Sequence, residues 1–133
     1  MKKLGIINQP ISAVIAGLGH MDMITIADAG LPIPGGTQRI DLALKKGVPG
    51  FLETLEVVLS EMCIEKVIIA TEMRERSPRV YEGVKKIIGK VPMEEISHIT
   101  FKAMLPETKA VIRTGELTPF ANVILIAGPW GFD

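Results

Sequence analysis

The amino-acid sequence predicts an α/β fold in which helices pack on a mixed, largely buried β-sheet. Short β-branched apolar runs alternate along the chain with segments of helical periodicity, which is typical of this class. The last two predicted strands are joined by the link GELTPF, which is too short for a helical crossover, so part of the sheet is expected to be antiparallel. With 133 residues, the chain has the length of one domain, 1–133.

The first half of the chain predicts two helices and two strands. Apolar residues over 11–18 follow the i, i+3, i+4, i+7 spacing of one helix face, and Gly19 is placed as the C-terminal cap. The run MITIAD, residues 23–28, predicts a buried strand that leads into a loop rich in Gly and Pro. An apolar stripe over 51–62 predicts the second helix, and KVIIA, residues 66–70, predicts the second strand.

The second half predicts further helices and strands in alternation. Ser77 as N-cap and Pro78 at the first helical position begin a helix over 77–90. The charged segment EMRERSPR before it is interpreted as a solvated face without function. The remaining predicted elements are a strand over 93–98 that ends in His98, a short helix over 100–109 broken near Pro106, and strands over 110–114 and 121–128.

Composition excludes several classes of partner. Fifteen Lys and Arg balance fifteen Asp and Glu, so no long-range positive field would attract nucleic acid or an anionic membrane. No apolar run approaches the ~20 residues of a membrane span, and the single cysteine, Cys63, fits a reducing compartment. We therefore expect a cytoplasmic protein. The apolar fraction of 47% is high for a small domain and predicts a homo-oligomer whose subunits cover part of that surface.

The sequence lacks the common catalytic motifs. Glycine-rich nucleotide loops, paired zinc ligands and the serine nucleophile elbow are all missing. The two histidines are 78 residues apart, which is weak support for a metal site. We therefore expect neither a metal nor a cofactor.

Four polar residues stand out because each lies at the edge of an apolar element: His20, Asp28, His98 and Asn122. Side chains at such edges can converge on one cleft, and this set, with Lys102 near His98, suits a polyhydroxylated neutral ligand. Simpler explanations stand beside this one. The first histidine follows a helix C-terminus, the aspartate can start an Asx turn, the second histidine can be a surface imidazole, and the asparagine can merely begin a strand.

The phrases LGHMD, DAGLPIP, RIDLAL, GVP, AVIRTGE and TPFAN occur in this order along nearly the whole chain. In that order and spacing the sequence resembles the ribose branch of the RbsD/FucU sugar mutarotase family. The resemblance implies a three-layer α/β/α subunit and a decamer of two pentameric rings, with sugar sites at subunit contacts. It also implies interconversion of the pyranose and furanose forms of free D-ribose in the cytoplasm, without a cofactor.

Carried over position by position, the resemblance gives His20 the role of general acid, and an imidazole with a pKa near ~6.5 suits proton transfer at neutral pH. The sugar-contacting positions that it implies are Asp28, His98, Phe120, Ala121 and Asn122. The family has tyrosine at the position of Phe120, so one hydroxyl that normally faces the sugar is missing here. The tail AGPWGFD also differs from the family's ending, and its bulky Trp130 is expected to reshape a cleft or a subunit contact.

Spacing within the first predicted strand adds a geometric expectation. If residues 20–28 are extended at ~3.3 Å per residue, His20 and Asp28 lie about 25 Å apart and cannot touch one sugar within one subunit. Either the segment folds back or neighbouring chains complete each site, and we favour the second alternative. Three other functions stay open: mutarotation of fucose or a deoxy-sugar, non-catalytic sugar binding in the cytoplasm, and a purely structural oligomer.

Overall fold

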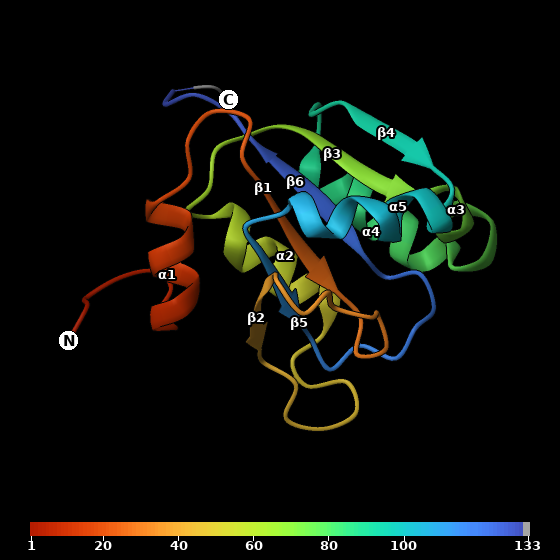
Figure 1. Cartoon of the computed structure of the whole chain (residues 1–133), viewed down its shortest axis with the longest axis horizontal. Helices are drawn as coiled ribbons and strands as arrows, with labels where there is room; N and C mark the ends of the chain where they lie inside the picture. Colours follow the sequence, from red (N-terminus) through yellow and green to blue (C-terminus); the bar gives the residue numbers. More distant parts are fainter. Residues whose placement is uncertain (132–133) are drawn as a thin grey trace.

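The chain folds into one six-stranded sheet with helices on both faces, and the computed structural model describes residues 1–131 (Figure 1). Strand order across the sheet is β2-β5-β1-β6-β3-β4. In chain order the elements are α1 (Gln9–Ala16), β1 (Met23–Ala27), β2 (Gln38–Asp41), α2 (Phe51–Leu59), β3 (Ile64–Ala70), α3 (Thr71–Arg76), α4 (Pro78–Ile88), β4 (Met93–Ile96), α5 (His98–Met104), the 3₁₀ turn η1 (Leu105–Glu107), β5 (Ala110–Arg113) and β6 (Val123–Ala127).

The sheet is mixed, as predicted, and β6 is its antiparallel strand. β6 runs antiparallel to both neighbours, β1 and β3, whereas β1 with β5, β2 with β5, and β3 with β4 pair in parallel. β5 and β6 follow one another in the chain but do not pair, because β1 lies between them with Thr25 opposite Val111 on one side and Ile124 on the other. The carboxyl ends of β1 and β5 therefore lie beside the amino end of β6.

Alternating side chains of the strands bury both faces of the sheet. Ile24 and Ile26 point to the face covered by α1, α2 and α4, where Phe51, Leu55 and Val84 are fully buried. The neighbouring positions of the strands point to the opposite face, which α5 and η1 cover with two fully or nearly fully buried side chains, Phe101 and Leu105. Full burial of such a side chain stabilises the fold by about 1.5–3 kcal/mol. The expected α/β/α arrangement of three layers is confirmed.

The first helix ends earlier than its apolar pattern predicts. α1 stops at Ala16, and the backbone N–H of Gly17 donates to carbonyl groups of the last turn, so the prediction of Gly19 as the cap is wrong. The N–H of Gly19 instead donates to Asp22 Oδ2 at 2.8 Å. This bond belongs to the turn that leads into β1. The Asp22 side chain therefore holds Gly19 in that turn, outside the helix to which the apolar pattern assigned it.

Three elements in the middle of the chain differ from the predictions. The charged segment that was interpreted as only a solvated face contains the helix α3, because Met73 is fully buried while the charged residues around it face solvent. Strand β4 ends at Ile96, so the prediction of a strand ending in His98 is wrong. Ser97 accepts a hydrogen bond from the Thr100 N–H and thereby starts α5 at His98. Strand β2 was not predicted, since only Ile40 of its four residues is buried.

The helices are short compared with a lipid bilayer: over residues 1–131 none has the length and apolarity needed to cross a membrane. In the tail AGPWGFD, Trp130 is 99% exposed and borders a hollow of about 310 Å³ beside Leu18 and Cys63. The last two residues of that tail lie outside the described part of the chain, so its expected effect on a cleft or a subunit contact stays a prediction.

Candidate active site

A cleft of about 310 Å³ opens where β1 ends. Side chains from the loop after β1, the start of α5 and the loop between β5 and β6 form its walls. Its lining residues include Asp28, Leu31, His98, Glu116, Leu117 and Phe120. Three of the residues singled out in the sequence, Asp28, His98 and Phe120, therefore line this cleft. Asn122 is not a lining residue but contacts Asp28. The size suits a small polar ligand.

Asn122 holds Asp28 in a fixed position. Asn122 is 1% exposed at the start of β6; its Oδ1 accepts the Asp28 backbone N–H at 2.8 Å, and its Nδ2 donates to Asp28 Oδ2 at 3.1 Å. The Gly30 N–H donates to Asp28 Oδ1 at 2.9 Å, so the Asx turn is present and exists together with the cleft. Burial raises the pKa of Asp28, and the hydrogen bonds from Gly30 and Asn122 partly oppose that rise.

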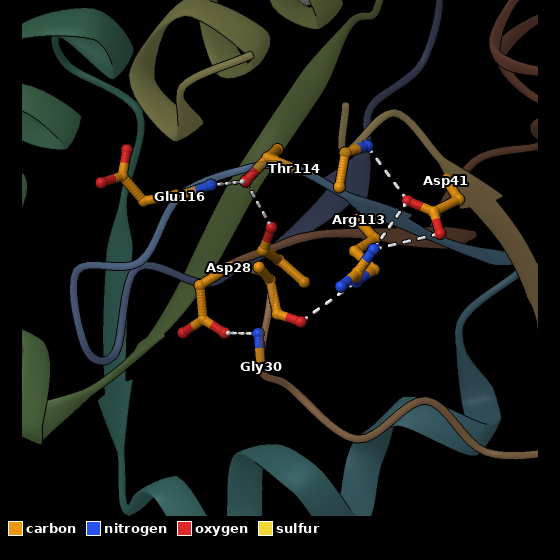
Figure 2. Close-up of polar contacts among 9 residues, drawn as sticks. Asp28, Gly30, Asp41, Arg113, Thr114 and Glu116 are labelled. Carbon is orange, nitrogen blue, oxygen red and sulfur yellow. Dashed lines mark hydrogen bonds and ion pairs between the residues drawn. The ribbon is translucent and has the colours of Figure 1, made fainter. Parts of the chain in front are cut away.

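Polar contacts of Arg113 and Thr114, at the carboxyl end of β5, also hold the loop that carries Asp28 (Figure 2). Arg113 donates through Nε to the Ala29 carbonyl at 3.0 Å and through Nη1 to both carboxylate oxygens of Asp41 at 3.1 Å. Thr114 donates its hydroxyl to the Ala27 carbonyl at 2.7 Å. Arg113 and Thr114, at the carboxyl end of β5, thus hold the backbone on both sides of Asp28.

Glu116 also lines the cleft, and sequence reasoning missed it. Its carboxylate accepts the Phe51 N–H at 3.0 Å and the Thr118 hydroxyl at 2.7 Å, while its carbonyl accepts the Ala29 N–H at 2.8 Å. Burial alone would raise the pKa of Glu116, but the bonds from Phe51 and Thr118 outweigh it and lower that pKa. The residue lies within the phrase AVIRTGE, but its contacts with Phe51 and Ala29 are distant in sequence and no local pattern marks them.

His98 lies against two aromatic rings. The Phe120 ring meets its imidazole edge-on with 5.0 Å between centroids, and Phe101 stacks with it at 6.3 Å. The His98 backbone N–H donates to the Glu72 carboxylate at 3.1 Å, and its ring Nδ1 is buried without a hydrogen-bond partner among residues 1–131. Burial lowers the pKa of His98 and the positive charge of Lys102 lowers it further, so the neutral imidazole is favoured.

The segment 120–122 presents its three members to the cleft in different ways. Phe120 has a φ of 62°, in the left-handed region that is strained for a bulky side chain, and its ring borders the cleft. Ala121 is fully buried in the core and is not among the residues that line the cleft, so its expected contact with a sugar stays a prediction. Asn122 acts through Asp28, because its own side chain is almost completely buried.

His20 is not part of this cleft. It lies in the turn before β1, whereas Asp28 follows the other end of that extended strand, so the alternative in which residues 20–28 fold back is wrong. Its side chain is 53% exposed, and Nε2 lies 2.9 Å from Oε2 of Glu65 in β3. Within one chain, the candidate proton-transfer group of His20 is therefore separated from the candidate binding groups by the length of β1.

Metal-ligating side chains do not gather in this region. Over the described residues 1–131, no group of three or more His, Cys, Asp or Glu side chains is placed to hold a metal ion. The candidate site is instead composed of hydrogen-bonding groups and the Phe120 ring, which borders the cleft, while the His20 imidazole lies at a distance.

A family model described as the RbsD / FucU transport protein family matches residues 1–129. The chain belongs to this RbsD/FucU family. Curated relatives support the assignment over nearly the whole length. A protein of Coprothermobacter proteolyticus named D-ribose pyranase is 56% identical over 96% of this chain and 98% of its own length. A protein of Chloroflexus aggregans with the same name is 53% identical over the same shares of the two chains. The family resemblance seen in the sequence is confirmed.

Solved structures agree with this RbsD/FucU assignment. RbsD of Bacillus subtilis, solved in complex with D-ribose, has a TM-score of 0.95 and 46% identity and covers 97% of this chain and 98% of its own. A fucose mutarotase of Streptococcus pneumoniae, solved with L-fucose, has a TM-score of 0.83 at 20% identity, which shows a shared fold only. The expected RbsD-like fold class is confirmed.

Proposed function

We propose that this protein is a D-ribose pyranase, an isomerase that interconverts the pyranose and furanose forms of free D-ribose. The observation that carries the proposal is the near-complete match to curated relatives of that name at more than half identity. The cleft supports it, because a carboxylate held by Asn122 and a neutral imidazole between aromatic rings suit sugar hydroxyl groups. No group in this mechanism requires a metal or a cofactor.

In the proposed mechanism, His20 transfers protons and the cleft residues hold the sugar. Opening of the pyranose ring removes a proton from the anomeric hydroxyl and delivers one to the ring oxygen, and closure through another hydroxyl reverses both transfers. Asp28 accepts hydrogen bonds from sugar hydroxyl groups, His98 contributes its second ring nitrogen, and the ring of Phe120 and the main chain of Ala121 border the sugar. Asn122 keeps Asp28 in place. A positioned acid or base of this kind typically contributes about 10²–10⁴-fold.

The proposed active site is shared between subunits of a homo-oligomer. His20 and Asp28 lie at opposite ends of β1, so one sugar can meet both only when a second chain supplies one of them. Large apolar side chains are exposed in several places, among them Leu4, Ile7, Met21, Leu44 and Ile99, and a neighbouring subunit would cover such surface. The proposed assembly is a decamer of two pentameric rings in the cytoplasm.

A second candidate is a mutarotase for a different sugar, such as fucose or a deoxy-sugar. The observation that favours it is Phe120, whose ring borders the cleft without a hydroxyl group. Loss of one hydrogen bond to a hydroxyl costs about 0.5–1.5 kcal/mol, so a sugar lacking the corresponding hydroxyl would bind here without penalty.

Exchange NMR of D-ribose at neutral pH tests both candidates, with the native protein, His20→Ala and Phe120→Tyr measured side by side. We expect the native protein to accelerate pyranose–furanose exchange above the spontaneous rate and His20→Ala to lose that acceleration. Binding of ribose without acceleration would indicate a non-catalytic sugar-binding protein. Acceleration with fucose or a deoxy-sugar but not with ribose would favour the second candidate, and no sugar binding at all would leave a structural oligomer.

A further inference from the structure

Glu65, the partner of His20, lies at an irregularity of the sheet. On β3, Ile64 is opposite Ala127 and Lys66 is opposite Ile126, so Glu65 is an extra residue that has no counterpart on β6. Such a bulge breaks the alternation of the strand and redirects a side chain, and bulges are frequent next to active sites. Here the carboxylate of the extra residue meets the imidazole with 2.9 Å between Oε2 and Nε2.

The turn that carries His20 is also constrained. Met21 has a φ of 75°, a left-handed conformation that costs free energy for an unbranched apolar side chain. Its N–H donates to the Ala127 carbonyl at 2.9 Å, and the Ala127 N–H donates back to the Asp22 carbonyl at 2.8 Å. Ala127 of β6 therefore pairs beside the bulge and also holds the turn. These two contacts place Glu65 next to His20.

The chemistry of a carboxylate decides which ring nitrogen carries the proton. An ionised carboxylate can only accept hydrogen bonds, so the His20 nitrogen that faces Glu65 must be the N–H donor. In a neutral imidazole the other nitrogen, Nδ1, then has a free lone pair. A surface ion pair contributes only about 0–1 kcal/mol to stability, so stability alone is a weak reason for a bulge and a left-handed residue at this point.

We propose that Glu65 is a positioning residue that keeps the Nε2 proton of His20 in place, so that Nδ1 is the atom that exchanges protons with the sugar. This inference rests on the proposed function of His20. Nδ1 takes the proton of the anomeric hydroxyl as the C1–O5 bond breaks and the aldehyde forms. The imidazolium, stabilised by the charge of Glu65, returns a proton to O5. Closure through O4 repeats the transfers in reverse, and the imidazole ends unchanged.

Nitrogen NMR of the protein tests the tautomer without any measurement of activity. The chain has only two histidines, so ¹⁵N-histidine labelling gives two ring systems, and His20→Ala assigns them. Solid-state spectra of sedimented protein are independent of oligomer size. At alkaline pH, we expect the His20 ring of the native protein to show protonated Nε2 and bare Nδ1. Glu65→Ala, and Glu65→Gln, whose amide can donate as well as accept, should give mixtures of tautomers. A native His20 ring with its proton on Nδ1 would overturn the inference.

Kinetics separate positioning from a general structural effect. Loss of one charge-assisted hydrogen bond predicts about tenfold lower kcat in Glu65→Ala with KM for ribose unchanged, and the glutamine variant should recover part of that loss. Glu94→Ala, which breaks the Lys66–Glu94 ion pair on the same part of the sheet, is the matched control and should keep native kcat. An unchanged kcat in Glu65→Ala, with active native protein, contradicts the inference but not the proposed function. Inactive native protein contradicts the function, and the nitrogen spectra still test the tautomer.

Discussion

The two ends of β1 are arranged in very different ways. At its carboxyl end, Asp28 is fixed by Gly30 and Asn122, and the adjoining His98 ring lies against two phenylalanine rings. At its amino end, His20 is half exposed and lies beside Glu65. The proposed binding groups are thus held in place within one chain, whereas the proposed proton-transfer group is presented on the surface. If the proposed function holds, folding of one chain forms the binding half of the site and assembly of chains completes the catalytic half.

The largest expected effect comes from removing the His20 imidazole, which should affect the catalytic half of the site and not the binding half. We expect His20→Ala to lower the enzyme-dependent rate of ring exchange by about 10²–10⁴-fold, because the proton-transfer group is lost. Ribose affinity should change much less than the rate, since the groups proposed to hold the sugar hydroxyls, Asp28 and His98, stay in place. Exchange NMR measures the rate and calorimetry the affinity. A loss of affinity as large as the loss of rate would place His20 among the binding groups instead.

Mixed oligomers test whether two chains share each site. The His20→Ala and Asp28→Ala variants should each be inactive when expressed alone. When the two are co-expressed, a site that takes His20 from the Asp28→Ala chain and Asp28 from the His20→Ala chain is intact. In random mixtures about a quarter of the sites combine two native residues, so about a quarter of native activity is expected. Activity that stays at background in verified mixed oligomers would contradict a shared site.

The next effect concerns the buried amide that supports Asp28. Asn122→Ala leaves the Asp28 N–H and carboxylate without their partner, which should cost about 1–3 kcal/mol in free energy of unfolding and weaken ribose binding. Asn8→Ala is a suitable control, because it removes the N-cap of α1 at about 0.5–2 kcal/mol but lies far from the cleft. Chemical denaturation and calorimetry should therefore show destabilisation in both variants and loss of affinity in the first only.

A smaller effect is expected from restoring a hydroxyl group in the cleft. If ribose is the substrate, Phe120→Tyr should gain about 0.5–1.5 kcal/mol in ribose binding through one hydrogen bond. Phe101→Tyr is the matched control, since that ring is fully buried and its new hydroxyl would destabilise the core without reaching the ligand. Calorimetry with ribose and with a deoxy-sugar distinguishes the outcomes. A tyrosine variant that binds ribose more weakly would indicate a different substrate.

The smallest effect concerns His98, in the binding half of the site, and is measured through pH. The pKa of His98 lies below its ordinary value of 6.5 because the ring is buried, so the unfolded chain takes up that proton first on acidification. The free energy of unfolding should therefore be intact above pH 6.5 and fall as pH drops from there towards the lowered folded pKa. His98→Gln should reduce this slope, and Asn8→Ala, which removes a helix cap but no titratable group, should leave it as in the native protein. Denaturation between about pH 7.5 and about pH 5.5, above carboxyl titration, measures it. Equal slopes in native protein and His98→Gln would contradict the assignment.

Periodic apolar patterns predicted most of the fold. Within residues 1–131, four of the five helices and five of the six strands coincide with predicted elements, and Ile24 and Ile26 of β1 illustrate the apolar pattern. Strand β2 was missed because only Ile40 is buried, so an edge strand carries too few apolar positions for a pattern. Helix α3 was missed for a related reason, since four of its six residues are charged and Met73 is its one apolar side chain. Elements with one apolar side chain show no apolar period, and they form through tertiary contacts that local sequence does not show.

The candidate site was predictable where it coincides with element ends. His20, Asp28 and Asn122 all lie beside apolar strands, where a strand explains the neighbours but not the polar residue. Glu116 and Glu65 were missed because their importance comes from contacts with residues distant in the sequence, Phe51 and His20. The bulge that redirects Glu65 depends on pairing between β3 and β6, and pairing register is a property of the folded sheet.

The position of β1 between β5 and β6 has a consequence for how this protein family can change its ligand. A loop that joins two non-neighbouring strands must span two strand spacings, about 9.6 Å, and pass over the end of the strand between them. In this chain that loop lies over Asp28 and carries Glu116, Leu117 and Phe120. A roofed pocket is therefore inherent in the strand order, and substitutions or insertions in the roof can alter ligand selectivity while the sheet beneath keeps its hydrogen bonds.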